Sequence, residues 1–389
     1  MSPLPPAERL ARLALSRLAE PGAWPVHDAV EEVGAAAVVG QLREGRAALG
    51  ISPALAAAAQ ARATHVDAAA DLARLAEVGG RLVCPGDEEW PAARLTWTRR
   101  GALLQAPPLA LVVRGSLRLD EAVERSVALV GARAASAYGE HVAGELVTGL
   151  ADEGVTVVSG GAYGIDGAAH RGALASGRAP TVAVLACGVD VAYPRGHDRL
   201  LARVAERGLL VSEHPPGATP TRVRFLVRNR LIAALSRGTV VVEAALRSGS
   251  LSTAGRARDL LRPVMAVPGP VTSALSAGCH ALLRRAEGEE PAAELVTGCR
   301  EVLAAVSPVG EHDAAPVRGR DRPRDALPEL VRTVLEAVPL RGGSGEATIA
   351  RDAGVPVLAV QQVLPPLLVA GLVERSETGW RLSPLGAGR

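Results

Sequence analysis

The segment Val155-Thr-Val-Val-Ser-Gly-Gly-Ala-Tyr-Gly-Ile-Asp166 decides the fold, because an apolar run ends in a glycine-rich loop that leads into a helix-like stretch. The same order recurs along the chain, with apolar runs at Val127–Val130, Thr181–Leu185, Leu209–Val211 and Thr239–Val242. Each repeat takes roughly 25–30 residues, which suits a βαβ unit. The pattern predicts a parallel α/β sheet with one polar edge, and ligands of such sheets bind at the carboxyl ends of the strands.

The composition indicates a globular protein without a lysine-based active site. Hydrophobic residues make up 48% and charged residues 22% of the 389 residues, which favours two or three domains. The net charge of +2 argues neither for nor against a nucleic-acid partner. All 43 basic residues are arginine, so a Schiff-base lysine and a Walker-type phosphate-binding lysine are excluded.

The cysteines and the N-terminal sequence indicate the cellular compartment. Cys84, Cys187, Cys279 and Cys299 lie far apart without a C-x-x-C pair, which argues against a zinc site and a disulfide framework. The first residues lack the basic and apolar segments of a signal peptide, and no run approaches the ~18 apolar residues of a membrane span. We therefore expect a cytoplasmic protein that makes no membrane contact.

Breaks in the pattern predict four segments. Residues 1–76 carry apolar positions at helical spacing and are expected to form a small all-α domain, and residues 77–290 are expected to form the α/β core. Two short runs in the first part of that core, Arg81–Cys84 and Leu109–Val113, could be edge strands. Residues 291–325 are charged and rich in proline and glycine, so they are expected to be a linker.

The last segment, residues 326–389, is expected to form a winged helix, because three helix-like stretches precede a hairpin-like Leu372–Leu382. The recognition helix of such a domain typically enters a major groove. Here that helix, Val357–Ala370, has no arginine and only two glutamines as polar reach, and Pro365-Pro366 should kink or shorten it. We therefore favour a protein-contact or structural role over reading of duplex DNA.

Two loops after the first strands offer hydrogen-bond donors to an anion. Gly131-Ala-Arg133 places a glycine and an arginine before a helix start, although a plain turn has the same pattern. Ser159 and Gly160 open a glycine-dense loop that resembles a dinucleotide loop. No acidic residue ends the next strand to bind a ribose, so a nicotinamide or flavin enzyme is a poor fit. Asp166 is expected to stabilise this turn, and a catalytic pair with His170 lacks an evident nucleophile.

The densest basic patch is Arg222-Val-Arg-Phe-Leu-Val-Arg-Asn-Arg230, which surrounds the only phenylalanine, Phe225. We expect this patch to begin as a loop and to enter a helix near Val227. Arginine and asparagine side chains can bind phosphates, and an aromatic face can stack a base. The alternative is a core phenylalanine flanked by solvated charges.

The loop after the last of these runs supplies small donors at a helix start, although an ordinary capped helix has the same pattern: Ser248, Gly249, Ser250 and Thr253. Glu243, at the start of this loop, does not suit a phosphate site. It is expected to hold an arginine of the segment 228–230 in place or to accept from a base amino group.

With these loops in this order, the chain resembles the DNA processing protein A (DprA/Smf) family. The matches are Leu129–Arg133, Tyr138-Gly139, Ser159-Gly160, Gly164–Asp166, Ala169-His170, Ala173-Leu174, Gly188, Tyr193-Pro194, Ser212-Glu213, Phe225, Arg228–Ile232, Val242–Ala244, Ser248–Ser250, Thr253-Ala254 and Ala266–Gly269. The chain departs from the family at Ala132, where serine is usual, at Gly161 and Tyr163, and at Arg222, where lysine is common.

The resemblance implies an extended Rossmann-like core with a small helical N-terminal domain (SAM-like or helix-hairpin-helix-like) and a C-terminal winged helix. It also implies a protein that is not an enzyme and uses no cofactor. Such a protein protects incoming single-stranded DNA, loads the RecA recombinase in natural transformation or recombinational repair, and dimerises through the core. The residues expected to contact DNA are Gly131, Arg133, Ser159, Gly160, Arg222, Phe225, Arg228, Asn229, Arg230, Glu243, Ser248, Gly249, Ser250 and Thr253.

Two other hypotheses stay open. A nucleotide hydrolase that cleaves base–ribose bonds could use Glu243 as its carboxylate, although the Pro-Gly-Gly-x-Gly-Thr type of loop is absent near it. Alternatively, the C-terminal winged helix could bind duplex DNA as a regulator, with the core as its sensor.

Overall fold

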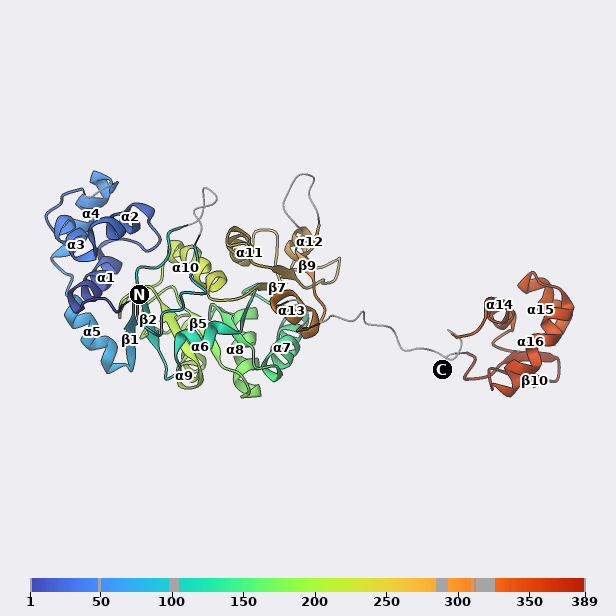
Figure 1. The fold of residues 1–389 in the computed structure, drawn as a ribbon. Helices are drawn as coiled ribbons and strands as arrows, with labels where there is room; N and C mark the ends of the chain where they lie inside the picture. The colour runs from blue at the N-terminus through green and yellow to red at the C-terminus, as the bar shows by residue number, and fades with distance from the viewer. Residues whose placement is uncertain are drawn as a thin grey trace. The chain divides into compact units, whose positions relative to one another are not determined.

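The computed structural model describes residues 2–47, 50–97, 105–284, 293–308, 311–312 and 326–387. The chain divides into two compact units, residues 1–314 and 315–389. The first unit holds a large sheet covered by helices, and the second holds α14 to α16 and a hairpin (Figure 1).

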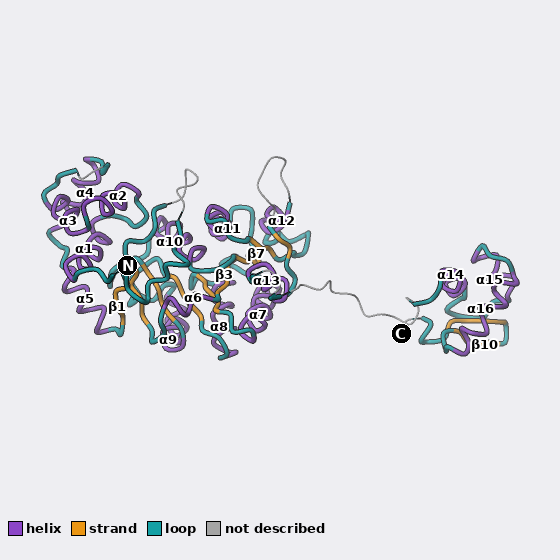
Figure 2. Tube along the Cα trace, viewed as in Figure 1, coloured by secondary structure: helices purple, strands orange, loops and turns teal. Residues whose placement is uncertain are grey.

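The described residues of the first unit form a nine-stranded sheet in the order β1-β2-β6-β5-β4-β3-β7-β8-β9. Figure 2 draws the strands in orange and the helices around them in purple. The strands are Gly80–Val83 (β1), Leu111–Arg114 (β2), Ser126–Gly131 (β3), Thr156–Ser159 (β4), Thr181–Val184 (β5), Leu209–Ser212 (β6), Thr239–Glu243 (β7), Val264–Ala266 (β8) and Glu294–Leu295 (β9). The pairs β1–β2 and β2–β6 are antiparallel and the other pairs are parallel. The predicted parallel α/β sheet is confirmed.

The central strands are buried on both faces, which explains their unbroken apolar sequence. In β3, Val127 and Leu129 pack into one core layer, whereas Ala128 and Val130 pack into the layer on the opposite face. This alternation follows the two-residue period of a strand. Both layers also hold apolar side chains of the covering helices, so each apolar run stabilises the sheet from two sides.

Helices cover both faces of the sheet. One face carries Ala137–Asp152 (α7), Ile165–Ser176 (α8), Asp198–Arg207 (α9) and Cys299–Val306 (α13), and the other carries Leu119–Glu124 (α6), Arg222–Ala234 (α10), Gly249–Asp259 (α11) and Ala277–Leu283 (α12). From β3 the chain builds outward through β4, β5 and β6 on one side and through β7 and β8 on the other. The strand order therefore reverses beside β3, and ligands of open α/β sheets bind at the carboxyl end of such a switch point.

The predicted helical N-terminal segment consists of Pro6–Leu18 (α1), Trp24–Val33 (α2), Ala35–Arg43 (α3), Pro53–Ala63 (α4) and Ala68–Glu77 (α5). These helices share an apolar core of their own. However, Leu13 of α1 and Leu75 of α5 are buried against sheet residues such as Leu82 and Leu210. The helical segment and the sheet therefore form one compact unit rather than two separate bodies.

The prediction of a linker from residue 291 is wrong in its first part. β9 adds to the sheet beside β8, and α13 packs on the outer face near α7. Val296, Val302 and Leu303 are buried in the same core layer as the central strands. Apolar burial outweighs the charged flanking sequence here, so the core extends to Val306. The other residues of the predicted linker, apart from 307–308 and 311–312, lie outside the described residues.

The second unit contains Glu329–Ala337 (α14), Glu346–Ala353 (α15), Val357–Val369 (α16), Val373–Ser376 (β10) and Gly379–Leu382 (β11). The two strands pair as the predicted hairpin, with Ser376 opposite Gly379. The helix α16 continues through Pro365 and Pro366 to Val369, so the expected early end at these prolines is wrong, and the expected kink stays a prediction. The elements stand in the predicted order, and their classification as a winged helix stays a prediction.

Within the described residues, no single helix is long and apolar enough to cross a membrane. The helices α15 and α16 reach that length and composition only when this bent pair is counted together.

Candidate nucleic-acid interface

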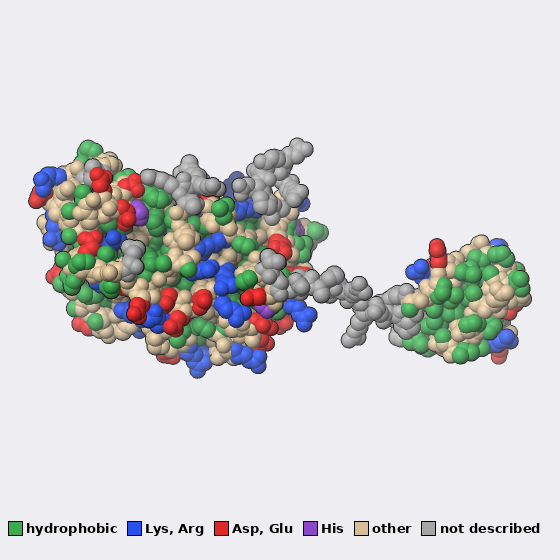
Figure 3. Space-filling model, viewed as in Figure 1, with side chains coloured by type: hydrophobic (Ala, Val, Ile, Leu, Met, Phe, Trp, Pro, Cys, Tyr) green, Lys and Arg blue, Asp and Glu red, His purple; other side chains and the backbone are tan. Residues whose placement is uncertain are grey.

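A cavity of about 780 Å³ opens at the carboxyl edge of the sheet, beside the switch point. It is lined by the exits of β3, β4, β5, β6 and β7: Val130–Ala134, Ala162, Asp166, Tyr193, Pro220–Arg222, Phe225, Leu226, Arg228, Asn229, Ile232, Ala245, Arg247–Ser250, Thr253 and Leu275. Ten of the fourteen residues predicted to contact DNA line this cavity. In the space-filling view, a group of basic side chains lies near the middle of the visible face of the first unit (Figure 3).

Phe225 stands in the cavity wall and is surrounded by cations. It lies on the first turn of α10, whose N-terminus is capped by the Thr221 hydroxyl accepting from the backbone N–H of Arg224. The helix thus begins at Arg222, five residues earlier than the predicted start near Val227. The guanidinium of Arg133 lies 4.9 Å from the Phe225 ring centre and that of Arg228 lies 5.8 Å from it. These contacts hold two positive charges over an aromatic face.

Backbone carbonyl groups at the base of the cavity hold the Arg228 guanidinium in place. Its Nη1 donates to the carbonyl oxygen of Gly160 at 2.7 Å and also to that of Val184. Burial lowers the pKa of Arg228 to about 10, and the nearby Asp166 carboxylate offsets part of that decrease. The guanidinium is therefore a fixed cation at neutral pH on the floor of the cavity, held in place before any ligand arrives.

Asp166 lines the base of the cavity and places its carboxylate near the Arg228 guanidinium. Its Oδ2 accepts from the backbone N–H of Ala162 at 3.3 Å, which supports the predicted role as a turn-stabilising residue. Burial raises the pKa of Asp166, and the charge of Arg228 counteracts that increase. The suggested pair with His170 is absent: His170 Nδ1 lies 2.8 Å from the Thr181 hydroxyl, in the buried core.

The opposite wall is the start of α11. Ser248 caps this helix by accepting from the backbone N–H of Ser250, and the two hydroxyls lie 2.7 Å apart. Asn229 of α10 donates from Nδ2 to the carbonyl oxygen of Gly249 at 3.2 Å, which ties the two walls together. Hydroxyls and free N–H groups at a helix start suit an anionic oxygen.

Four of the predicted contact residues, Ser159, Gly160, Arg230 and Glu243, do not line the cavity. Ser159 is fully buried and its hydroxyl donates to the carbonyl oxygen of Leu129 at 2.6 Å. Gly160 lies beneath Arg228, where an added Cβ would come within 2.6 Å of the guanidinium nitrogens. Gly160 therefore allows the close approach of the guanidinium and does not itself line the cavity.

Arg230 does not line the cavity either. It is completely buried and forms a bidentate ion pair with Glu213, with N···O distances of 2.6 and 2.7 Å. Its Nε donates to the carbonyl oxygen of Ala106 at 3.1 Å. Arg230 thus joins α10 to the β6 exit and to the segment before β2.

Glu243 is buried and pairs with no arginine among the described residues, so the first of its two expected roles is wrong, and acceptance from a base amino group stays a prediction. Its carboxylate accepts from the backbone N–H of Ser136 at 2.8 Å and from the Ser136 hydroxyl at 2.7 Å. It therefore fixes the start of α7 from the end of β7. This contact joins residues that are far apart in the chain, so the sequence offered no signal for it.

Several lining residues were not among the predicted contacts: Tyr193, Leu226, Arg247 and Leu275, with Pro220 and Thr221 at the entrance to α10. Tyr193 packs against Phe225 at a ring distance of 5.4 Å. Two sequence signals could have identified such residues. Tyr193 precedes a proline in a loop after β5, and Arg247 lies inside the polar loop that follows β7.

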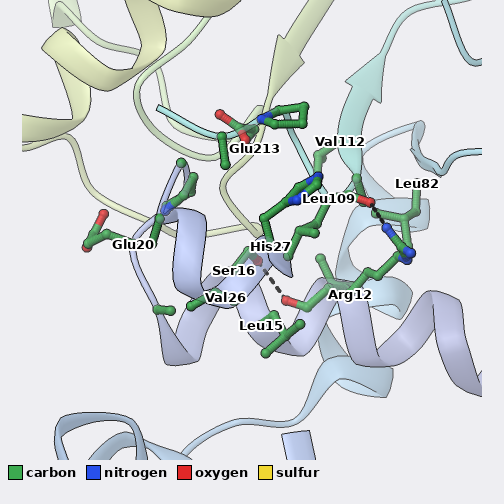
Figure 4. A pocket seen from close by; sticks show the side chains of 18 residues that line it. Arg12, Leu15, Ser16, Glu20, Val26, His27, Leu82, Leu109, Val112 and Glu213 are labelled. Carbon is green, nitrogen blue, oxygen red and sulfur yellow. Dashed lines mark hydrogen bonds between the residues drawn. The ribbon is translucent and has the colours of Figure 1, made fainter. Parts of the chain in front are cut away.

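A second, smaller cavity of about 40 Å³ lies between α1 and the sheet (Figure 4). Arg12 crosses it and donates to the carbonyl oxygen of Leu109 at 2.9 Å, and Glu213 on its wall is already paired with Arg230. This volume suits one or two water molecules. It cannot admit a nucleotide, so the larger cavity is the candidate site.

The described residues contain no group of three His, Cys, Asp or Glu side chains able to hold a metal ion. The cysteines among them are free thiols, and burial raises the pKa of Cys187, which lies near Arg228, to about 11. Phosphate and base recognition in this cavity would rest on arginines, hydroxyls and aromatic rings.

The fold and the cavity define a class: a doubly wound Rossmann-like protein with a cavity at its switch point, where ligands of such sheets bind. Residues 81–306 match the model of a family described as DNA recombination-mediator protein A. The chain belongs to this DNA processing protein A family, as the sequence motifs predicted.

Individual relatives agree with this assignment. The putative DNA processing protein DprA of Mycobacterium tuberculosis is 48% identical over 387 residues, which cover 96% of this chain and 94% of the relative. Protein Smf of Escherichia coli is 38% identical over 281 residues, covering 70% of this chain and 69% of Smf. The X-ray structure of DNA processing protein A from Streptococcus pneumoniae is similar with a TM-score of 0.60 and 32% identity, covering 79% of this chain and 99% of that one.

Proposed function

We propose that this DNA processing protein binds single-stranded DNA in the cavity at the carboxyl edge of the sheet. The observation that carries the proposal is the arrangement around Phe225, where Arg133 and Arg228 flank the ring and Tyr193 packs beside it. Arginines neutralise backbone phosphates, and aromatic faces stack bases of any sequence. Bases paired in a duplex are already stacked and cannot use such a ring.

Binding should be independent of sequence and sensitive to salt. Oligothymidine binding, measured over a range of salt concentrations, should give a log–log slope of about −0.7 per phosphate contacted. Duplex DNA of the same length should bind much more weakly. Equal affinities for the single strand and the duplex would contradict the proposal.

We propose that the protein acts without catalysis or a cofactor. The nucleotide-hydrolase alternative required a free carboxylate at Glu243, whose oxygens are occupied by Ser136. This engagement argues against that alternative, and Asp166 is held beside Arg228 on the floor. Incubation with nucleoside monophosphates should release no base. Base release that is proportional to protein and abolished by Asp166→Asn or Glu243→Gln would favour an enzyme.

We further propose that the protein is a cytoplasmic recombination mediator that protects incoming strands, loads the RecA recombinase in natural transformation or recombinational repair, and dimerises through its core. Family membership supports this role. The test is RecA filament formation on single strands covered by a single-strand-binding protein, with Phe225→Ala as the binding-deficient control. Sedimentation of the purified chain tests the dimer. Unchanged filament formation would refute the mediator role.

A further inference from the structure

The aromatic side chains of this chain are few and unevenly placed. It has four tryptophans, three tyrosines and one phenylalanine. All three tyrosines and the phenylalanine lie at the carboxyl edge of the sheet: Tyr138 after β3, Tyr163 after β4, Tyr193 after β5 and Phe225 after β6. Tyr193 and Phe225 line the cavity, whereas Tyr163 stands outside it with 48% of its surface exposed.

The Tyr163 ring is held in place by its neighbours. It packs edge-on against the ring of His197, with a centre-to-centre distance of 4.7 Å and an interplanar angle of 71°. Its hydroxyl lies over Gly196, where an added Cβ would come within 2.6 Å. His197 itself is buried and its Nδ1 lies 3.0 Å from the carbonyl oxygen of Gly161. A ring that is already ordered loses little conformational freedom when a base stacks on it.

Tyr163 also stands next to the cavity. Its chain neighbour Ala162 lines the cavity. On the other side, Gly196 beneath the Tyr163 hydroxyl is three residues after Tyr193, a separation of at most about 11 Å along the chain. The exposed Arg195 lies between them and forms no ion pair with another described residue. A phosphate that leaves the cavity past Tyr193 would meet this cation.

We infer that Tyr163 is a second stacking platform, which takes a base of the strand after it leaves the Phe225 cavity, with Arg195 contacting the phosphate between the two bases. This inference rests on the proposed binding of single-stranded DNA. It assigns a path along the edge of the sheet, from α10 across the β5 exit to the β4 exit. The site would therefore have a core subsite at Phe225 and an outer subsite at Tyr163.

The test measures binding of oligothymidines of about 4 and about 12 nucleotides, a range that spans single-strand site sizes. Tyr163→Ala should weaken binding of the long strand by roughly 5- to 100-fold and leave the short strand within about twofold of wild type. Tyr163→Phe keeps the ring and should bind both strands like wild type. Tyr138→Ala is the matched control, because Tyr138 is exposed on the same edge but lies over Pro268-Gly269, outside the cavity.

Four outcomes are distinguishable. The length-dependent loss in Tyr163→Ala alone supports the inference. No loss, an equal loss for both lengths, or an equal loss in Tyr138→Ala overturns it. If Phe225→Ala weakens both lengths while Tyr163→Ala changes neither, binding in the cavity stands and only the outer subsite fails. If wild-type protein binds neither strand, the proposed function fails and the inference fails with it.

Discussion

Arg228 and Arg230 lie two positions apart on α10, and the structure gives them opposite tasks. Residues at this spacing do not share a helix face. Arg228 turns toward the cavity and flanks the Phe225 ring, whereas Arg230 turns into the core and pairs with Glu213. One helix thus has a ligand-facing side and a structural side. A high density of arginine therefore marks a helix with binding potential, and the helical phase decides which of its arginines face the cavity.

The largest expected effect lies on the structural side. Arg230→Ala should lower the free energy of unfolding by about 3–5 kcal/mol, because Glu213 would be left as a buried charge without its partner. Urea denaturation measures this loss. Arg222→Ala on the same helix is the control, since Arg222 is exposed, and it should unfold like wild type. Full stability of Arg230→Ala with a lower salt slope of DNA binding would reverse the assignment of the two faces.

On the ligand side, Phe225→Ala should weaken binding of oligothymidine by roughly 5- to 100-fold, the range for loss of one base-stacking ring. The half-buried ring contributes less to the core, so unfolding should change little. Fluorescence anisotropy with a labelled strand measures the affinity. Val223→Ala provides the control, because Val223 is exposed on the same turn and does not line the cavity. Wild-type affinity in Phe225→Ala would contradict a stacking role.

Lowering the pH should reduce the stability of the folded chain through a buried group on the structural side of α10, next to Glu213. His214, next to Glu213, is buried, and burial lowers its pKa to about 4. A histidine in the unfolded chain is protonated near pH 6.5, whereas His214 in the folded chain stays neutral until about pH 4. The stability of the folded chain should therefore decrease as the pH falls from 6.5 toward 4. When the pH is lowered from 7 to 5, the free energy of unfolding, measured by urea denaturation, should fall by about 2 kcal/mol more for wild type than for His214→Gln. The exposed His65 serves as control in His65→Gln, and an identical pH profile for wild type and His214→Gln would be inconsistent with this account.

A smaller effect is expected at Arg133, which is exposed above the Phe225 ring. Arg133→Ala should reduce the magnitude of the salt slope of oligothymidine binding by about 0.7, the value of one phosphate contact. The control is Arg207→Ala, because Arg207 ends α9 just before β6, at the amino edge of the sheet. An unchanged slope in Arg133→Ala would place the phosphate elsewhere.

The smallest effect is expected from removal of the second unit. Its helix α16 exposes Leu358 and Val369 and has no basic residue, and the visible face of this unit is largely hydrophobic (Figure 3). A chain truncated after Pro308 retains β9 and α13 and should bind oligothymidine within about twofold of the full chain. A large loss of affinity, or loss of duplex binding present in the full chain, would favour the regulator hypothesis.

The sequence predicted the features that depend on local pattern. The apolar runs identified β3 to β7, and the polar strand exits together with the basic patch Arg222–Arg230 identified ten residues of the cavity. It failed where a contact joins distant segments. Glu243 and Ser136 meet only once β7 and β3 are neighbours, and Glu213 reaches Arg230 only after α10 has packed on the sheet.

The register of α10 was the other limit. Proline and glycine before the basic patch suggested a loop, but Thr221 caps the helix at once and fixes its phase. A start near Val227 would have left the orientation of Arg228 and Arg230 undefined. The core boundary failed for a similar reason, because two short elements around Val296 and Val302 are too small to be recognised from periodicity.

Gly160, which lies beneath Arg228, is a position at which even the smallest side chain should disturb the cavity. An alanine at position 160 would displace the guanidinium, because the new methyl group would meet both of its terminal nitrogens and the Asp166 carboxylate. A random screen for variants that still fold but no longer retain DNA should therefore recover Gly160, although the residue does not line the cavity. Substitutions at position 160 and at Arg228 should therefore be coupled, because a side chain at position 160 requires the guanidinium to move.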